Sequence, residues 1–278
     1  MLTDVLINGE KKHNLDITDR GLQYGDGLFE TIEVTSGRAV FISRHLDRLQ
    51  LGCKQLFIPY PGDIVLLSEI DLLLEGTESA VLKIQLTRGQ GGRGYRQPEI
   101  VEPTRILSLY PFPAFPECYK QEGVRVRLCS GRLGSNPSLA GIKHTNRLEQ
   151  VLARAEWVSE SIQEGLMFDQ QGCLVEGTMS NIFMVKDGML LTPLLVNCGV
   201  AGIIRGIILD YGAENGFHVE PRLLTKEHLY RADEVFLTNS IIGIWPVSHI
   251  DNYSLSVGAV TRQISQCVDQ LKTQDIQS

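Results

Sequence analysis

A lysine stands at an unusual place in the stretch SLAGIKHTNRLEQVLARAEW, residues 138–157. Lys143 follows a turn of small residues and precedes a predicted helix. The apolar positions that share one face of that helix are Leu148, Val151, Leu152, Ala155 and Val158. Most lysines are solvated surface groups, but Gly141 lets the backbone approach another group closely, and side chains in such connections are often functional. Lys143 is therefore a candidate reactive amine.

A carboxylate accompanies this lysine further along the chain. Glu176 ends the predicted strand CLVE and is followed by the small residues GTMSN. A carboxylate at such a corner can pair with a ring nitrogen, although most acids in turns are simply solvated. Glu176 becomes informative only in combination with the other groups.

An anion site is predicted in two further stretches. In NCGVAGIIRG, residues 197–206, glycines precede a helix that is expected to start near Ile203. Free N–H groups and the helix dipole favour an anion there, although a plain helix cap uses the same residues. In LTNSIIG an apolar strand ends in the polar residues Thr238, Asn239 and Ser240. Arg48, on a predicted helix, can add positive charge.

These groups together indicate one cofactor. A lysine amine, a carboxylate for a pyridinium nitrogen and an anion nest with an arginine are what pyridoxal phosphate requires. Its phosphate carries about −1.5 to −2 charges, which suits a helix N-terminus and Arg48. The sequence has no nucleotide P-loop, no H-E-x-x-H motif and no cysteine cluster, so neither a nucleotide-triphosphate site nor a metal site such as zinc is predicted.

A glycine-rich loop follows a predicted strand. GQGGRG, residues 89–94, satisfies the dinucleotide pattern G-x-G-x-x-G, but no helix opens after it, so that interpretation fails. Three arginines, Arg88, Arg93 and Arg96, lie in or beside the loop. They predict either a solvated mobile loop or a lid whose guanidinium groups bind carboxylates.

Composition excludes several classes of protein. The chain has 278 residues, 43% of them hydrophobic and 21% charged, and a net charge of −7. This charge argues against nucleic acid or an anionic membrane as the main partner, and the apolar runs are too short to span a bilayer. We see no secretory signal, and six scattered cysteines without a C-x-x-C pair indicate reduced thiols. A cytoplasmic protein is expected.

Strands and helices are interspersed without strict alternation, which predicts an α+β fold. Two strands joined by Ser36 and Gly37 are expected within 27–42. Further strands are expected within 4–10, 79–89, 104–112, 124–130, 165–169, 173–177, 181–185, 189–193, 217–223 and 234–240. Helices are expected from about 43, over 63–75, after 143, from about 203 and over 257–271, followed by a frayed tail. A proline-rich stretch predicts a boundary, with an N-terminal α/β domain at 1–112, a linker at 113–122 and a C-terminal cofactor-binding domain at 123–278.

Longer motifs carry a resemblance over nearly the whole chain. INGE, DRGLQYGDGLFETIEV and HLDRLQLGCKQL resemble the opening of the fold type IV pyridoxal-phosphate enzymes, and VEGTMSNIF and GVAGIIR are shared across that family. RGQGGRGY and LGSNPSLAGIKHTNRLEQVLAR resemble the 4-amino-4-deoxychorismate lyases more closely than the branched-chain or D-amino-acid transaminases.

The resemblance implies roles for individual residues. Lys143 would bind the cofactor covalently and act as the catalytic base, and Glu176 would pair with the pyridine nitrogen. The residues implied for the phosphate are Arg48, Ile203, Ile204 and Ser240, the two isoleucines through their backbone. Tyr24 and Asn146 are further expected cofactor contacts. For the substrate carboxylates the candidates are Arg88, Arg93 and Arg96, with Arg93 favoured.

The resemblance also implies an architecture and an activity. The family fold has two α/β domains of mixed sheets flanked by helices, with the cofactor between them, and forms a homodimer. The implied activity converts 4-amino-4-deoxychorismate to 4-aminobenzoate and pyruvate for folate biosynthesis. The alternative is a transaminase of the same fold that acts on D-amino or branched-chain amino acids, and a non-catalytic vitamin-binding or interaction protein is the other class considered.

Overall fold

The chain forms two compact units, which are not consecutive in sequence. A computed structural model describes residues 4–277. Within this range, unit 1 comprises residues 4–113, 142–146 and 274–277, and unit 2 comprises residues 114–141 and 147–273. The division expected from the sequence, with consecutive domains, puts residues 142–146 and 274–277 in the C-terminal domain, whereas the structure puts them in unit 1. One of these segments carries Lys143.

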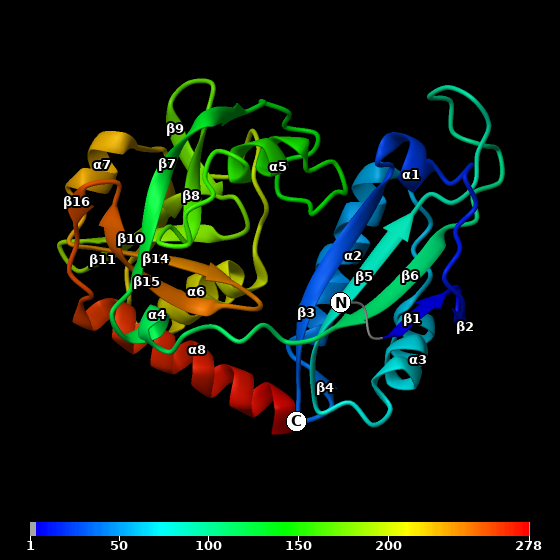
Figure 1. Cartoon of the computed structure of the whole chain (residues 1–278), viewed down its shortest axis with the longest axis horizontal. Coiled ribbons are helices and arrows are strands. Elements are labelled where there is room, and N and C mark those ends of the chain that lie inside the picture. The colour runs from blue at the N-terminus through cyan, green and yellow to red at the C-terminus, as the bar shows by residue number, and fades with distance from the viewer. Residues whose placement is uncertain (1–3, 278) are drawn as a thin grey trace. The chain divides into compact units, whose positions relative to one another are not determined.

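Unit 1 contains a six-stranded antiparallel sheet of order β2-β1-β6-β5-β3-β4. Its strands are β1 (Asp4–Ile7), β2 (Glu10–Lys11), β3 (Gly27–Thr35), β4 (Arg38–Ala39), β5 (Ser79–Thr87) and β6 (Thr104–Tyr110). The turn between β3 and β4 is formed by Ser36 and Gly37, both with positive φ, as the sequence predicts. Figure 1 shows β3, β5 and β6 side by side in blue, cyan and green.

One face of this sheet is covered by helices. The helices of unit 1 are α1 (Arg20–Tyr24), α2 (Ile42–Leu56) and α3 (Asp63–Leu74). Leu28, Ile32, Leu82, Ile84 and Leu107 lie on the covered face and are almost fully buried. A Cβ at Gly52 of α2 would lie 2.8 Å from the methyl groups of Leu28, so α2 approaches the sheet closely because it has glycine there.

Unit 2 is built on a larger mixed sheet. Its main path has the order β12-β11-β10-β14-β15-β7-β8-β9-β13, and β16 pairs with β15. The strands are β7 (Val124–Leu133), β8 (Glu164–Asp169), β9 (Cys173–Gly177), β10 (Asn181–Lys186), β11 (Met189–Pro193), β12 (Val219–Arg222), β13 (Leu224–Thr225), β14 (Glu234–Asn239), β15 (Gly243–Ile250) and β16 (Tyr253–Ser254). Parallel pairs join β11 to β12, β15 to β7 and β7 to β8.

The helices of unit 2 are α4 (Cys118–Gln121), α5 (Leu148–Arg154), α6 (Ile203–Glu214), α7 (Lys226–Tyr230) and α8 (Ala259–Gln277), whose last turn belongs to unit 1. The core packs apolar strand residues such as Leu166, Ile182 and Leu237 around Trp245. The α+β expectation with mixed sheets and flanking helices is confirmed. No helix among residues 4–277 is long and apolar enough to cross a membrane.

Two local expectations differ from the structure. The apolar face predicted for the helix after Lys143 is exposed, since Leu152 of α5 is 70% exposed and Val158 beyond it is 97% exposed. The buried residues there are Ala153 and Trp157. The tail that was expected to be frayed is instead helical, since α8 runs to Gln277. Its last turn is held by the Asp275 carboxylate, which accepts the Phe41 N–H at 2.5 Å.

Candidate active site

Lys143 lies in a short segment, residues 142–146, that pairs with the beginning of β3. The Phe29 N–H donates to the Lys143 carbonyl at 2.9 Å, and the Thr145 N–H donates to the Gly27 carbonyl at 3.0 Å. This part of β3 is open to pairing because β4 pairs only with the far end of the strand. The backbone of Lys143 is therefore held by sheet pairing.

Asn146 and Gly25 fix the end of this segment. The Asn146 amide donates to the Gly25 carbonyl at 2.8 Å, and the Thr145 hydroxyl donates to the same carbonyl at 2.6 Å. Gly25 ends α1 with a φ of 65°, and a Cβ there would lie 2.6 Å from the Asn146 side-chain oxygen. Only glycine fits, so Asn146, predicted as a cofactor contact, also ties the lysine segment to α1.

The Phe29 ring is approached by two amines. The Nζ of Lys143 lies 4.4 Å from the ring centroid, and the Nζ of Lys83 lies 5.4 Å from it. Burial lowers the pKa of Lys83. The ring thus lies beside the Lys143 amine and supplies a π face that attracts it when it is protonated.

A buried carboxylate orients Arg48. Glu30 of β3 and His45 of α2 are almost completely buried. The Arg48 guanidinium binds Glu30 through two nitrogens, with Nε at 2.8 Å from Oε1 and Nη2 on Oε2, and Nδ1 of His45 lies 2.6 Å from Oε2. Burial alone raises the pKa of Glu30, but the charge of Arg48 and the hydrogen bond from His45 lower it to about 2. Glu30 is therefore ionised and fixes the direction of the Arg48 side chain.

Glu176 lies near the end of β9 in unit 2 and is 5% exposed. Its Oε2 accepts the Val200 N–H at 2.8 Å, and its Oε1 accepts the Gln150 amide at 3.3 Å. Burial lowers the pKa of the neighbouring Arg147 guanidinium, while the carboxylates of Glu176 and Glu149 oppose that shift. The Glu176 carboxylate is thus held in one orientation by groups from two other segments of unit 2.

The N-terminus of α6 is capped by no side chain. A Cβ on Gly202, which precedes α6, would lie 2.0 Å from the side-chain oxygen of Asn181, and the Asn181 amide donates to the Val200 carbonyl at 2.8 Å. Glycine is required at this position. The backbone N–H groups of Ile203 and Ile204 begin the helix, where the dipole favours an anion, as the sequence predicts.

Two residues with hydroxyl groups, Thr238 and Ser240, lie at the end of β14 in unit 2. Thr238 lies opposite Asn181 on the neighbouring strand, and its buried hydroxyl has no hydrogen-bond partner among residues 4–277. The Asn239 side chain accepts the N–H groups of Ile241 and Ile242 at 2.8 and 2.9 Å, which shapes the turn that contains Ser240. Buried polar groups are normally satisfied, so the Thr238 hydroxyl fits a site for an additional polar group.

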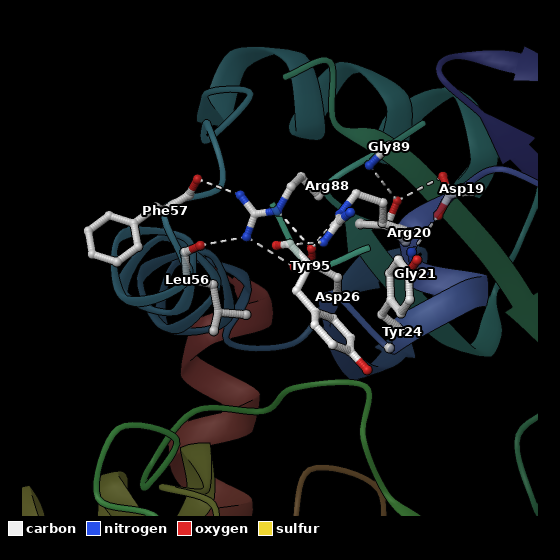
Figure 2. Close-up of polar contacts among 12 residues, drawn as sticks. Asp19, Arg20, Gly21, Tyr24, Asp26, Leu56, Phe57, Arg88, Gly89 and Tyr95 are labelled. Atoms are coloured by element: carbon white, nitrogen blue, oxygen red, sulfur yellow. Dashed lines mark hydrogen bonds and ion pairs between the residues drawn. The ribbon is translucent and has the colours of Figure 1, made fainter. Parts of the chain in front are cut away.

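The three arginines of the glycine-rich stretch have different environments. Arg88 is 3% exposed, and its guanidinium donates to the Asp26 carboxylate and to the carbonyls of Leu56 and Phe57, at 2.7–3.0 Å (Figure 2). Arg93 and Arg96 are exposed, and Arg96 lies 3.7 Å from Glu99. Arg88 therefore does not belong to a mobile lid, because its guanidinium is buried and is bound to Asp26 and to two backbone carbonyls.

Tyr24 connects the end of α1 to this loop. Its hydroxyl accepts the Gly94 N–H at 3.1 Å, and its ring makes an edge contact with Tyr95 at 5.6 Å between centroids. Tyr24, which the sequence predicts to contact the cofactor, therefore also contacts the loop that carries Arg93.

Sequence reasoning missed the polar residues that hold the expected ones in place. Glu30 and His45 orient Arg48, and Asp26 binds both Arg20 and Arg88. A signal was present for Glu30 and His45, because charged or polar residues at buried positions of an amphipathic strand or helix need partners. For Asp26 and Arg20 the signal was their place in DRGLQYGDG, which surrounds Tyr24.

Comparison with known proteins identifies the family to which the chain belongs. The family model described as amino-transferase class IV matches residues 27–250, which include Lys143, Glu176 and Ser240, so the chain belongs to the class IV aminotransferase family. It is 36% identical over 262 residues to the aminodeoxychorismate lyase of Vibrio harveyi, covering 93% of this chain and 97% of that one. It is 29% identical over 263 residues to the D-alanine aminotransferase of Bacillus licheniformis, covering 92% and 91%.

A solved structure extends this similarity to three dimensions. The crystal structure of 4-amino-4-deoxychorismate lyase from Pseudomonas aeruginosa superimposes with a TM-score of 0.92 and 44% identity. The match covers 96% of this chain and 98% of that chain. The two-unit fold is thus that of a fold type IV enzyme.

The buried charge of Glu30 predicts a pH-dependent stability. Its pKa in the folded protein is about 2, below the ordinary 4.5, so its contribution is complete above about pH 4.5 and is lost as the pH falls towards 2. Glu30→Gln should lower the free energy of unfolding by roughly 3 kcal/mol at pH 7. The difference from the parent should narrow below pH 4.5. Urea unfolding at a series of pH values from about 7 to 3 measures it.

Glu78→Gln is the matched control, because Glu78 is an exposed acid of the same unit. Its stability should follow that of the parent at every pH. A gap between Glu30→Gln and the parent that stays constant with pH would contradict an ionised Glu30 with a lowered pKa.

Proposed function

We propose that the protein is a cytoplasmic pyridoxal-phosphate lyase that converts 4-amino-4-deoxychorismate to 4-aminobenzoate and pyruvate in folate biosynthesis. The observation that carries the proposal is the near full-length similarity to aminodeoxychorismate lyases. Identities of 44% and 36% to two such enzymes exceed the 29% identity to the D-alanine aminotransferase. The side chains that the chemistry needs are present in the matching motifs.

The residues present fit the cofactor. We assign the covalent attachment to the Lys143 amine and the pyridine nitrogen to Glu176, whose buried carboxylate is already oriented. The phosphate is assigned to Arg48, the hydroxyl of Ser240 and the N–H groups of Ile203 and Ile204. The uncapped start of α6 and the unsatisfied hydroxyl of Thr238 support an anion in this part of unit 2. Tyr24 and Asn146 are retained as further contacts.

The chemistry divides between the cofactor and the chain. When bound, pyridoxal phosphate supplies an electron sink for the substrate carbon that bears nitrogen. The Lys143 amine, freed when the substrate amine takes its place on the cofactor, would remove the proton from that carbon, and Glu176 would hold a proton on the pyridine nitrogen. The bond from the ring to the enolpyruvyl oxygen would then break, the released enolate would take up a proton to give pyruvate, and the substrate ring would become aromatic. Because aromatisation supplies much of the driving force, the main task of the chain is to align the C–H bond with Lys143.

The two substrate carboxylates need cationic partners. Arg93 and Arg96 are exposed and suit this role, and we favour Arg93 because Gly94, next to it, is hydrogen-bonded to Tyr24. Arg88 is assigned a structural role, since its guanidinium is buried and bound to Asp26 and two carbonyls.

A transaminase of the same fold is the second candidate, supported by the similarity to the D-alanine aminotransferase. Both reactions begin with proton removal by the same lysine. They differ afterwards, because a transaminase returns a proton and needs a 2-oxo acid acceptor, whereas elimination from the lyase substrate needs none.

We also propose a homodimer. The exposed apolar face of α5 supports it, because Leu148, Val151 and Leu152 are 59–75% exposed and lie at helical spacing. Contiguous exposed apolar residues commonly mark an interface, and most homo-oligomers are two-fold dimers.

The product test separates the two activities. With 4-amino-4-deoxychorismate as the only substrate, the purified protein should release 4-aminobenzoate and pyruvate in equal amounts without an added 2-oxo acid. Lys143→Ala should abolish this release, because the proton acceptor is lost. Lys83→Ala is the matched control, because its amine approaches the same Phe29 ring, and it should keep most of the activity. Dependence on added 2-oxoglutarate, or a strong preference for D-alanine, would instead establish the transaminase.

Glu176→Gln tests the assigned partner of the pyridine nitrogen. The variant should bind the cofactor, since the phosphate is held by other residues, but turnover should fall by about 10²-fold because one preorganised charge is lost. Cofactor absorbance and steady-state kinetics measure the two quantities. Glu160→Gln, at an exposed acid of unit 2, should match the parent. Turnover of Glu176→Gln within about twofold of the parent would refute the assignment.

Leu152→Glu tests the dimer. Light scattering should give two copies for the parent and a lower mass for the variant, because a charge placed on the apolar face of α5 is costly to bury. Ile64→Glu changes an equally apolar residue of α3 that is 85% exposed, and it should remain dimeric. An active parent monomer would contradict the dimer, and a dimeric Leu152→Glu would exclude this face.

A further inference from the structure

Residues 89–96, here called the arginine loop, are docked on the segment that begins α1. The Arg20 N–H donates to the Gly89 carbonyl at 2.8 Å, and the Gly91 N–H donates to the Thr18 carbonyl at 3.2 Å. These two bonds fix the first residues of the loop. The loop is therefore attached at its base by backbone pairing.

The far part of the loop is held by the Arg20 side chain. Its Nη1 donates to the Gly94 carbonyl at 3.0 Å, and its Nη2 lies 3.5 Å from the Tyr95 carbonyl. These two carbonyls follow Arg93 directly in sequence. The position of Arg93 thus depends on carbonyls that Arg20 binds.

Arg20 itself is fixed by the partly buried carboxylate of Asp26. Its Nε donates to Asp26 at 2.9 Å, and Arg88 binds the same carboxylate at 2.7 Å. Burial by itself raises the pKa of Asp26, but the hydrogen bonds and charges of Arg88 and Arg20 keep it below its ordinary value. Figure 2 shows Asp26 between the two guanidinium groups. The carboxylate stays ionised at neutral pH and aims the Arg20 fork at the loop.

Packing leaves little freedom to the Arg20 side chain. Its guanidinium carbon lies 4.8 Å from the centroid of the Tyr24 ring, and a Cβ on Gly91 would lie 2.6 Å from its Cδ. The hydroxyl of the same tyrosine accepts the Gly94 N–H. Arg20 and Tyr24 therefore bind the carbonyl and the N–H of one loop residue.

We propose that Arg20 is a positioning residue for substrate binding, which latches the arginine loop so that Arg93 is presented to a carboxylate of the substrate. The inference rests on the proposed function for the role of Arg93. Arg20 does not touch the substrate and acts only through Gly94 and Tyr95. Its three donor nitrogens serve three acceptors at once, which the single ammonium group of a lysine cannot reproduce.

Arg20→Lys keeps the charge and removes the fork. In the proposed enzyme, KM for 4-amino-4-deoxychorismate should rise about tenfold, as expected for the loss of one or two hydrogen bonds, while kcat stays within about twofold. Trypsin should cleave the folded variant after Arg93 or Arg96 at least about fivefold faster than the parent, because local opening exposes the loop. Arg38→Lys, an exposed arginine of β4, is the control and should change neither quantity.

A second variant guards against a folding defect. Gly91→Ala retains every charge and crowds the Arg20 stem, and it should shift KM and cleavage in the same direction. Arg93→Ala should raise KM at least as much as Arg20→Lys, because it removes the group that the latch presents.

The outcomes separate the latch from the proposed function. Unchanged cleavage in both Arg20→Lys and Gly91→Ala overturns the latch, and faster cleavage with an unchanged KM overturns its role in substrate binding. A loss of kcat alone also overturns that role. If the parent releases no 4-aminobenzoate, the proposed function fails, while the cleavage rates still decide whether Arg20 holds the loop.

Discussion

The backbone pairing between β3 and residues 142–146 is the interaction on which the candidate site depends. Four strands, β4 to β7, lie between β3 and Lys143 in sequence, yet the Phe29 N–H and the Lys143 carbonyl are 2.9 Å apart. Pairing at an open strand edge fixes the backbone of the lysine, and the Phe29 ring lies beside its amine. A reactive group held by a sheet has less freedom than one on a loop, which is the preorganisation that proton transfer needs.

Carboxylates that are buried or partly buried provide most of the remaining order. Glu30 directs Arg48, and Asp26 directs Arg20 and Arg88. In unit 2 the buried Glu164 accepts hydrogen bonds from residues 178–180, the turn that follows β9. Each is an anion that would be costly to bury alone, so it restricts its partners to the geometries that satisfy it. Precise placement of cations and turns thus follows from buried negative charge.

Local features of the fold were predictable from the sequence, whereas partners distant in sequence were not. The β3–β4 hairpin followed from Ser36 and Gly37, because turn chemistry is a property of adjacent residues. Lys143 and Glu176 were selected by their local context, but nothing local indicates that Phe29 lies beside the lysine. Helical spacing identified the apolar face of α5 without giving its direction, because periodicity does not tell a core from an interface.

The interrupted layout of unit 1 has a consequence for synthesis on the ribosome. Its sheet is encoded by residues 4–113, but residues 142–146 complete the edge of β3, and residues 274–277 supply the carboxylate for Phe41. A nascent chain that has released only residues up to 113 therefore carries an unpaired strand edge, a known risk for mispairing with other chains. Unit 1 reaches its final form only after translation of the C-terminal helix, so neither unit corresponds to a contiguous fragment that expression could isolate.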